Sequence, residues 1–394
     1  MNTKKRILLI LPGFNFGGTV FSTLNMISFL SKDYDVTVLP MTFQGPILNN
    51  YRQYGVKLFP ESLLLSGFTC NLDKMKIGWK KWLFSSIKII RRLLRYCGID
   101  YEYIVYKSKA RKIERKYTFD YVASCQEGSA TYFASCFQKA KRIAWFRSEY
   151  SVYKEECSDN TLIKEKRLYP LFDNIVCVSL TTRNDFVSFF PALSDKVFPI
   201  HNIQNVGDIE AKSKEYVSDM PMNVFTIVSV GRMNPQKRFS FIPSIARKLL
   251  DTGCSFKWII IGDGNVFGEW DKLQKEITNN HVEDTVLCLG GKVNPYPYIK
   301  CSDLLVNTSY VEACPRVVIE AKLLKTPVIC ADFSSAREFV TSDVDGYVDT
   351  IDKIHTHIAK MMLDKKYYSK IKTTCEAYSI DNDHIYSQLK DIFK

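Results

Sequence analysis

At 394 residues the chain is long for a single hydrophobic core, so two domains are expected. Hydrophobic residues make up 46% and charged residues 24%, which is ordinary for a globular protein and argues against a disordered or fibrous one. No window of about 18 uninterrupted apolar residues occurs, so no membrane-spanning helix is expected. The net charge of +12 predicts an anionic partner.

Twelve cysteines are scattered singly between Cys70 and Cys375, and no two of them form a C-x-x-C pair. This spacing argues against a zinc cluster or a thioredoxin-like motif and favours a reducing compartment, so we expect a cytoplasmic protein. The apolar run Ile7–Leu11 near the N-terminus is too short for a signal peptide and is better interpreted as a first β-strand.

The first strand is expected at Arg6–Leu11, followed by a glycine-bearing turn, a helix at Val20–Leu30 and a strand at Val36–Leu39. This order is typical of the beginning of an open α/β sheet. Ligands bind at the carboxyl ends of such strands, so Gly17 and Gly18 are expected to border a cleft. The alternative is a plain tight turn, because no complete G-x-G-x-x-G motif is present.

Nearly all the excess charge lies in residues 74–116, where fourteen Lys and Arg face three Asp and Glu, a local excess of eleven positive charges. On a helical wheel, residues 79–97 separate into a basic side and an apolar side. We interpret this segment as a helix lying on an anionic bilayer. The alternative is an ordinary amphipathic helix packed on its domain with the basic face in water. The expected membrane-surface residues are Trp79, Lys80, Lys81, Trp82, Lys88, Arg91, Arg92 and Arg95; Leu83, Ile87, Ile90, Leu93 and Leu94 complete the apolar side.

Further strands complete the first half and a second series follows it. The first-half strands are expected at Tyr121–Ser124, Arg142–Phe146, Asn174–Ser179 and Lys196–His201. Residues 207–222 are charged without regular apolar spacing and are interpreted as a linker. The second-half strands are expected at Val224–Val230, Lys257–Ile261, Val286–Leu289, Leu304–Val306 and Pro327–Cys330, alternating with helices. The alternation predicts a second parallel sheet with helices on both faces.

The stretch Tyr310–Ile329 carries two glutamates, Glu312 and Glu320, on either side of an expected helix start. A helix N-terminus offers free N–H donors to an anion, and the carboxylates could hold the hydroxyls of a sugar nucleotide. Arg232 and Lys237 follow the first strand of the second half, where two cations could neutralise a departing pyrophosphate.

These motifs together resemble the retaining glycosyltransferases of family 4, of the "glycosyl transferases group 1" type. The resemblance is carried by Gly231-Arg232 with Lys237, by Gly262-Asp263-Gly264, by residues 294–298 (NPYPY) and by Glu312-x7-Glu320. It implies an α/β protein with the GT-B fold, in which two Rossmann-like, doubly wound domains face a central cleft. We therefore expect an acceptor-side domain at 1–206 that contains the basic amphipathic segment 74–116. A nucleotide-sugar-binding domain is expected at 207–375, and a C-terminal helix at 376–394 that returns to the first domain.

The resemblance also implies roles for single residues. The catalytic set would be Glu312, which contacts the transferred sugar, and Arg232 and Lys237, which hold the donor diphosphate. Donor-binding residues would be Glu320 at the ribose, the backbone amides of Arg316 and Val317 at the phosphate, Gly291 and Val293 near the nucleobase, and Gly17 and Gly18 in the first domain. Arg147 and Asn202 would line the acceptor or sugar pocket. Arg147 stands where family members often have a histidine, and an arginine is always charged.

No metal or other cofactor is expected, because the fold that the chain resembles works without a bound metal. Asp343-x-Asp345 looks like a metal-binding pair but precedes a glycine in an expected loop. His355 and His357 are two residues apart in a helical stretch and do not share a face.

The sequence therefore predicts a metal-independent, retaining hexosyl- or N-acetylhexosaminyltransferase. It would move a sugar from a nucleotide donor, a UDP-sugar, to a lipid-linked glycan during capsule, lipopolysaccharide or exopolysaccharide synthesis in a bacterium. It would sit peripherally at the inner face of the membrane, with no nucleic-acid partner. One alternative is a non-catalytic, glycosyltransferase-like partner subunit, which would not hydrolyse sugar nucleotides. A second is a nucleic-acid-binding protein. Competition between lipid vesicles and oligonucleotides for the protein would distinguish it from a membrane-bound enzyme.

Overall fold

The computed structural model describes residues 4–15, 17–73 and 75–394; Phe16 of the expected turn and Lys74 of the basic segment lie outside these ranges. The chain forms two compact units, Met1–Gln204 with Asn382–Lys394, and Asn205–Asp381. The boundary falls two residues before the expected one, and the segment that rejoins the first unit begins at Asn382 rather than at residue 376.

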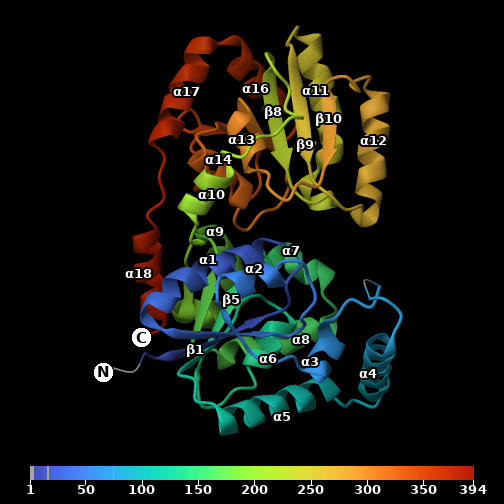
Figure 1. The fold of residues 1–394 in the computed structure, drawn as a ribbon, viewed down its shortest axis with the longest axis vertical. Coiled ribbons are helices and arrows are strands. Elements are labelled where there is room, and N and C mark those ends of the chain that lie inside the picture. Colours follow the sequence, from blue (N-terminus) through green and yellow to red (C-terminus); the bar gives the residue numbers. More distant parts are fainter. Residues whose placement is uncertain (1–3, 16, 74) are drawn as a thin grey trace. The chain divides into compact units, whose positions relative to one another are not determined.

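The first unit contains a sheet of seven parallel strands within its described residues, in the order β3-β2-β1-β4-β5-β6-β7 (Figure 1). Their bounds are β1 Arg6–Leu11, β2 Asp35–Pro40, β3 Lys57–Leu58, β4 Tyr121–Ser124, β5 Lys141–Phe146, β6 Asn174–Cys177 and β7 Val197–Pro199. Ile7 to Leu11 of the central strand are fully buried, as expected for a strand covered on both faces.

Helices cover both faces of this sheet. Their bounds are α1 Gly18–Asp33, α2 Leu48–Gln53, α3 Leu63–Thr69, α4 Trp79–Tyr96, α5 Tyr101–Lys116, α6 Ser129–Ala134, α7 Tyr150–Tyr153, α8 Asp159–Leu168, α9 Leu180–Phe189 and α18 Asn382–Ile392. The short strand β3 carries too few residues for an apolar pattern, which is why the sequence did not reveal it.

The C-terminal helix α18 packs against the first unit through its buried face. The Tyr386 hydroxyl donates a 2.7 Å hydrogen bond to Oδ2 of Asp33 at the end of α1. The buried ring of Phe393 lies 5.3 Å from that of Tyr121 in β4 and 6.2 Å from Trp145 in β5. The last helix thus covers strands that are more than 240 residues away in sequence.

The second unit contains six parallel strands within its described residues, in the order β10-β9-β8-β11-β12-β13. Their bounds are β8 Phe225–Val230, β9 Phe256–Ile261, β10 Val286–Gly290, β11 Leu304–Asn307, β12 Val328–Ala331 and β13 Gly346–Asp349. Alternate residues of these strands enter two separate apolar clusters, one on each face: Ile227 and Ile260 lie in one, Val228 and Ile259 in the other.

The helices of the second unit are α10 Val206–Lys212, α11 Ile242–Asp251, α12 Glu269–Asn279, α13 Tyr296–Cys301, α14 Arg316–Leu323, α15 Ala336–Phe339, α16 Ile354–Leu363 and α17 Lys365–Ala377. The interpretation of residues 207–222 as a linker is wrong. Helix α10 occupies part of this stretch, and Ile209 is buried in the core with Val217 and Met220 against it. The apolar residues are too few and too irregular for sequence periodicity to reveal this packing.

Candidate active site

The expected donor residues gather where the strand order of the second unit reverses, between β8 and β11. Such a switch point leaves a crevice at the carboxyl ends of the strands, where open α/β sheets bind ligands. The loop after β8 carries Arg232 and Lys237, and the loop after β11 carries Glu312. A Cβ on Gly262 would lie 2.0 Å from the Gly231 carbonyl oxygen, so glycine is required for the loops after β8 and β9 to approach.

Lys237 is fixed by both loops. It ends a short 3₁₀ turn, Pro235–Lys237, and its backbone N–H donates a 3.2 Å hydrogen bond to Oδ1 of Asn234. The Thr308 hydroxyl donates a 2.6 Å hydrogen bond to the Lys237 carbonyl oxygen. The Lys237 ammonium forms an ion pair with the carboxylate of Glu312. The pair is mostly buried, so the attraction is screened less than at the surface.

Glu312 is held by neutral donors as well. The Ser309 hydroxyl donates to Oε1 of Glu312 at 2.9 Å, and the Ser335 hydroxyl donates to its carbonyl oxygen at 2.5 Å. The carboxylate is therefore oriented before any ligand binds, which suits a residue that positions a sugar hydroxyl.

Arg232 differs from Lys237 because its side chain is exposed, with no hydrogen bond or ion pair in the described part of the chain. Its backbone carbonyl accepts a hydrogen bond from the Asn234 N–H at 2.9 Å, which shapes the loop. An exposed guanidinium beside a partly neutralised lysine leaves net positive charge for an anionic ligand.

Glu320 lies in the second turn of α14 and is buried, with 8% of its side chain exposed. Arg316 donates to Oε1 of Glu320 at 2.7 Å, and the Tyr296 hydroxyl donates to the same oxygen at 3.3 Å. Burial, and then the charge of Glu320, raise the pKa of Tyr296 well above its ordinary value. The sequence missed Tyr296 as a partner of this carboxylate, although the NPYPY motif contains it.

The remaining donor-side residues surround this cluster. Val317 lies in the first turn of α14, where backbone N–H groups have no acceptor inside the helix. Gly291 follows β10, and a Cβ there would lie 2.9 Å from Cβ of Asp263, so the loops after β9 and β10 are in close contact. Val293 is 95% exposed and free to contact a ligand.

In the first unit, the sheet order reverses between β1 and β4. Gly17 and Gly18 follow β1 and open α1, and open space surrounds the Cβ position of Gly17. Arg147 follows β5, and its guanidinium donates to Asn202 Oδ1 at 2.8 Å, to Ser22 Oγ at 2.9 Å and to the Cys125 carbonyl at 2.6 Å. The structure therefore joins the two residues expected in the acceptor or sugar pocket and adds Ser22, for which the sequence gave no signal.

The carboxylates and imidazoles that resembled a metal motif are engaged elsewhere. Asp345 pairs with Lys322, and Asp343 accepts a 3.0 Å hydrogen bond from Tyr367. His357 lies 2.9 Å from Asp349 and stacks on Tyr347. Among the described residues, no group of three His, Cys, Asp or Glu side chains is placed to hold a metal ion.

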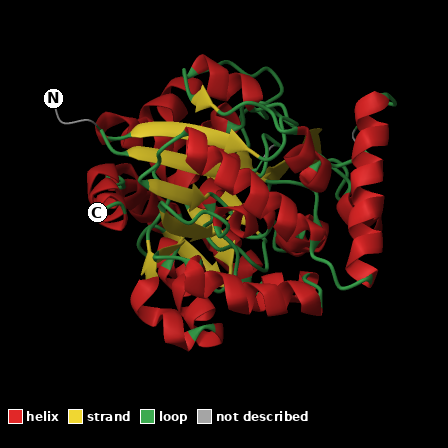
Figure 2. Ribbon diagram, turned by 90° about the horizontal axis from the view of Figure 1, so that it is seen from below, coloured by secondary structure: helices red, strands yellow, loops and turns green. Residues whose placement is uncertain are grey.

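Helix α4 presents its two faces in an unexpected way. In Figure 1 it lies at the outer edge of the first unit, on the right; Figure 2 shows the helices, in red, from a second side. Most of its apolar face is exposed: Trp79 by 65%, Trp82 by 73% and Leu93 by 60%, with Ile89, Ile90 and Tyr96 also exposed, whereas Ile87 and Phe84 are buried in the core. The interpretation with the basic face in water and the apolar face packed is therefore wrong.

Four of the eight expected membrane-surface residues are bound to the protein instead. Lys80 pairs with Glu61 at 3.2 Å, Arg91 with Glu102 at 3.4 Å, Lys88 donates to the Cys70 carbonyl at 2.7 Å and Lys81 to the Met75 carbonyl at 3.3 Å. Long basic side chains can lay their stems along the protein and still reach an acceptor, which reverses the usual orientation. Arg92 and Arg95 remain exposed. In the described ranges, no helix is both long and apolar enough to span a bilayer.

Comparison with known families identifies this arrangement. Residues 211–376 match the model of the family "Glycosyl transferases group 1". Over these residues the chain is similar to the group 1 glycosyltransferases. The match covers the second unit and contains Arg232, Lys237, Glu312 and Glu320, so the resemblance inferred from these motifs is confirmed.

Curated relatives of this glycosyltransferase domain include two with about the same coverage. An N-acetylgalactosamine-N,N'-diacetylbacillosaminyl-diphospho-undecaprenol 4-alpha-N-acetylgalactosaminyltransferase of Campylobacter jejuni is 30% identical over 54% of this chain and 58% of its own length. An uncharacterized glycosyltransferase of Methanocaldococcus jannaschii is 27% identical over 54% of this chain and 53% of its own. The chain thus spans about half the length of the curated relatives it matches.

Solved structures match over almost the whole chain at low identity and therefore show the fold. Anabaena HepE, in complex with UDP and glucose, has a TM-score of 0.73 at 17% identity and covers 99% of each chain. The TarM crystal structure has a TM-score of 0.74 at 13% identity and covers 100% of this chain and 99% of its own. The expected GT-B fold, with two Rossmann-like domains, is confirmed.

Proposed function

We propose that this protein is a retaining, metal-independent glycosyltransferase of surface polysaccharide synthesis. It transfers a hexosyl or N-acetylhexosaminyl unit from a UDP-sugar to a lipid-linked glycan. The observation that carries the proposal is the Lys237–Glu312 ion pair at the switch point of the second unit, beside the exposed cation Arg232. It places phosphate-binding charge next to a carboxylate that can hold a sugar hydroxyl.

The chemistry assigned to these residues is electrostatic. Arg232 and Lys237 neutralise the diphosphate as the bond between it and the sugar C1 breaks. The acceptor oxygen forms the new bond to C1 on the same face, and its proton passes to the departing phosphate. Glu312 holds the sugar and Glu320 the ribose. This route needs no protein nucleophile.

Two relatives support the choice of donor and acceptor. HepE was crystallised with UDP and with UDP-glucose, which supports a UDP-sugar donor. The Campylobacter relative's name includes a diphospho-undecaprenol, which supports a lipid-linked acceptor. Arg147 and Asn202 are assigned to the acceptor or the transferred sugar, since both present polar groups next to the switch point of the first unit.

The exposed apolar face of α4 supports peripheral attachment to the inner face of a membrane. Two tryptophans on this face suit the boundary between headgroups and acyl chains. The excess of eleven positive charges in residues 74–116 is complementary to an anionic bilayer. A lipid-linked acceptor and an anionic bilayer surface are thus the partners of the first unit.

A panel of nucleotide sugars tests the proposal. A ligand that binds only the native state raises the melting temperature, so one UDP-sugar should stabilise the protein more than UDP alone. The same UDP-sugar should be hydrolysed slowly when no acceptor is present. Adding a metal chelator should not stop this hydrolysis. Lys237→Ala should lose both effects, whereas Lys248→Ala, an exposed lysine of α11, should keep them. Absence of stabilisation by every nucleotide and nucleotide sugar would overturn the proposal.

A further inference from the structure

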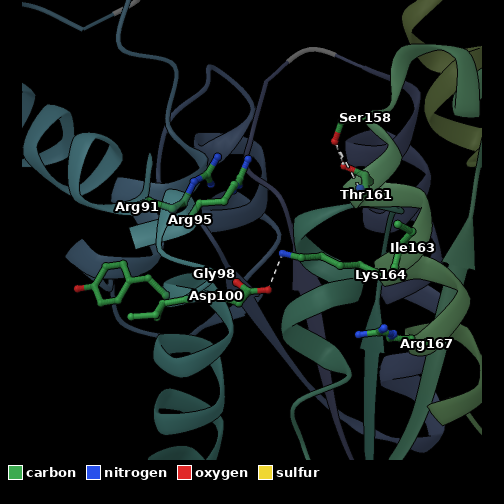
Figure 3. A pocket seen from close by; sticks show the side chains of 11 residues that line it. Arg91, Arg95, Gly98, Asp100, Ser158, Thr161, Ile163, Lys164 and Arg167 are labelled. Atoms are coloured by element: carbon green, nitrogen blue, oxygen red, sulfur yellow. Dashed lines mark hydrogen bonds and ion pairs between the residues drawn. The ribbon is translucent and has the colours of Figure 1, made fainter. Parts of the chain in front are cut away.

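A cavity in the first unit lies apart from the residues assigned to the donor and acceptor sites, although Arg91 and Arg95 of the basic side of α4 help to line it. Its volume is about 350 Å³, and it lies between α4, the turn from α4 to α5, and α8 (Figure 3). Its size falls in the range of small-molecule sites. The residues that line it are Arg91, Arg95, Gly98, Ile99, Asp100, Tyr101, Ser158, Thr161, Ile163, Lys164 and Arg167.

The charge of this cavity is strongly unbalanced. Four cations line it, against the single carboxylate of Asp100. Lys164 reaches from α8 to Asp100 at 2.6 Å, as Figure 3 shows. Asp100 also accepts a 2.6 Å hydrogen bond from the Tyr132 hydroxyl and a 3.1 Å bond from the Tyr103 N–H. The carboxylate of Asp100 is thus already neutralised by Lys164 and engaged in capping the N-terminus of α5.

Three arginines remain for a ligand. Arg91 pairs with Glu102 only at the long distance of 3.4 Å. Within the described ranges, the guanidinium groups of Arg95 and Arg167 form no ion pair and no hydrogen bond. In Figure 3, Arg91 and Arg95 lie on the α4 side of the cavity and Arg167 lies on the α8 side. The positive charges on facing walls of the cavity repel each other, and no carboxylate of the lining neutralises them fully. An anion bound between them would reduce this repulsion.

Neutral groups complete the lining. The hydroxyls of Ser158 and Thr161, 3.0 Å apart, can turn to donate to an anion. Ile99 and Ile163 are exposed by 42% and 50% and add apolar surface. Planar guanidinium groups bind phosphate oxygens in pairs, and hydroxyls add single donors, so the set suits phosphate better than a carboxylate.

We propose that this cavity binds a phosphate or diphosphate group that carries an apolar tail. The inference rests on the proposed function, because it makes the cavity the site of the phosphorylated carrier lipid of the acceptor. Helix α4 connects the two parts: its inner face supplies Arg91 and Arg95, and its outer face presents Trp79, Trp82 and Leu93. Helix α8 comes after α7, which follows the loop that carries Arg147.

Calorimetric titration of the full-length protein, with UDP saturating the donor site, tests this. The probes are inorganic pyrophosphate and farnesyl diphosphate. The pocket variant is Arg95→Gln with Arg167→Gln, both exposed side chains whose loss leaves the core intact. The matched control is Arg111→Gln with Lys112→Gln, which removes the same charge from the exposed side of α5.

We expect farnesyl diphosphate to bind at least tenfold more weakly to the pocket variant and unchanged to the control. If farnesyl diphosphate binds more tightly than pyrophosphate, the ligand is a phosphate attached to a lipid. If the two bind equally, the ligand is free phosphate, and the proposal that it carries an apolar tail is overturned. Vesicles with phosphatidic acid that compete as well as farnesyl diphosphate would assign the pocket to a bulk-lipid headgroup rather than to the acceptor carrier, which also overturns the proposal.

A separate readout keeps the two proposals distinguishable. None of the residues assigned to the UDP-sugar lines this cavity, so UDP-sugar binding and hydrolysis without acceptor should be unchanged in the pocket variant. If they persist while the pocket variant and the control bind farnesyl diphosphate alike, the cavity proposal fails alone. If no UDP-sugar binds at all, the proposed function fails.

Discussion

The ammonium group of Lys237 forms an ion pair with the carboxylate of Glu312, joining the loops that follow β8 and β11. These strands are neighbours in the sheet, although 73 residues, which include β9 and β10, lie between the end of β8 at Val230 and the start of β11 at Leu304. The pair therefore closes the switch point of the second unit. A donor diphosphate that binds here would share the lysine with Glu312.

Replacing Lys237 with Ala should reduce kcat/KM for transfer by about a hundredfold or more, the usual effect of removing one group that stabilises developing charge. The variant also leaves Glu312 unpaired, which repels the diphosphate, so donor affinity should fall as well. Steady-state kinetics with the UDP-sugar identified by the thermal-shift panel measure both. Near-normal turnover of Lys237→Ala would remove this residue from the catalytic set.

Replacing Arg316 with Met should destabilise the second unit by about 2–4 kcal/mol, because a buried carboxylate, Glu320, would lose its cation. Arg337→Met is a matched control: Arg337 pairs with Asp332 at 2.9 Å, but both side chains are exposed. Its cost should be below about 1 kcal/mol. Urea unfolding of both variants measures the difference. Equal stability of the two would show that Glu320 does not depend on Arg316.

Glu165 of α8 should make stability depend on pH. Burial raises its pKa from 4.5 to about 7, although the hydroxyls of Tyr153 and Tyr150 donate to it at 2.8 and 3.2 Å; the charge of Glu127 adds to the rise. Between pH 4.5 and 7 the folded state therefore holds a proton that the unfolded chain has lost. Because the unfolded state binds fewer protons, the free energy of unfolding falls as the pH rises through this window.

Glu165→Gln should abolish this fall, which amounts to at most about 3 kcal/mol. The stability gain of the variant over the wild type should grow from pH 5 to pH 8 in urea unfolding followed by fluorescence. Glu156→Gln, an exposed glutamate, is the control and should leave the pH dependence unchanged. A constant difference across this range would contradict the assignment.

Trp79→Gln with Trp82→Gln should weaken binding to vesicles that contain anionic lipid by at least tenfold, since both exposed rings lose their apolar area. Tyr216→Gln with Met222→Gln removes two side chains of the second unit that are even more exposed, and serves as the control. Co-sedimentation with phosphatidylglycerol-containing vesicles measures the effect. If both variants bind as the wild type does, the apolar face of α4 is not the attachment surface.

The Rossmann-like alternation of strands and helices in both halves was predictable from the sequence, because buried parallel strands are short apolar runs that end at glycines or polar residues. Glu312, Glu320, Arg232 and Lys237 were identifiable because each stands at a fixed distance from such a strand or from the start of α14. Their partners were not, because no sequence pattern marks them: Ser309 lies in the same loop as Glu312, whereas Tyr296 begins α13 and Ser335 precedes α15, and only the fold brings these two to the glutamates.

The sequence by itself determined that residues 79–97 have a basic side and an apolar side, because helical periodicity is written in the order of residues. Only the tertiary structure decided which side faces the protein. Contacts with Glu61, Glu102 and the Cys70 carbonyl hold the basic side inward and leave the tryptophans exposed. Periodicity shows that the helix has two faces but not which of them packs against the protein. The groups that bind the basic side chains lie elsewhere in the chain and contact α4 only once the unit has folded.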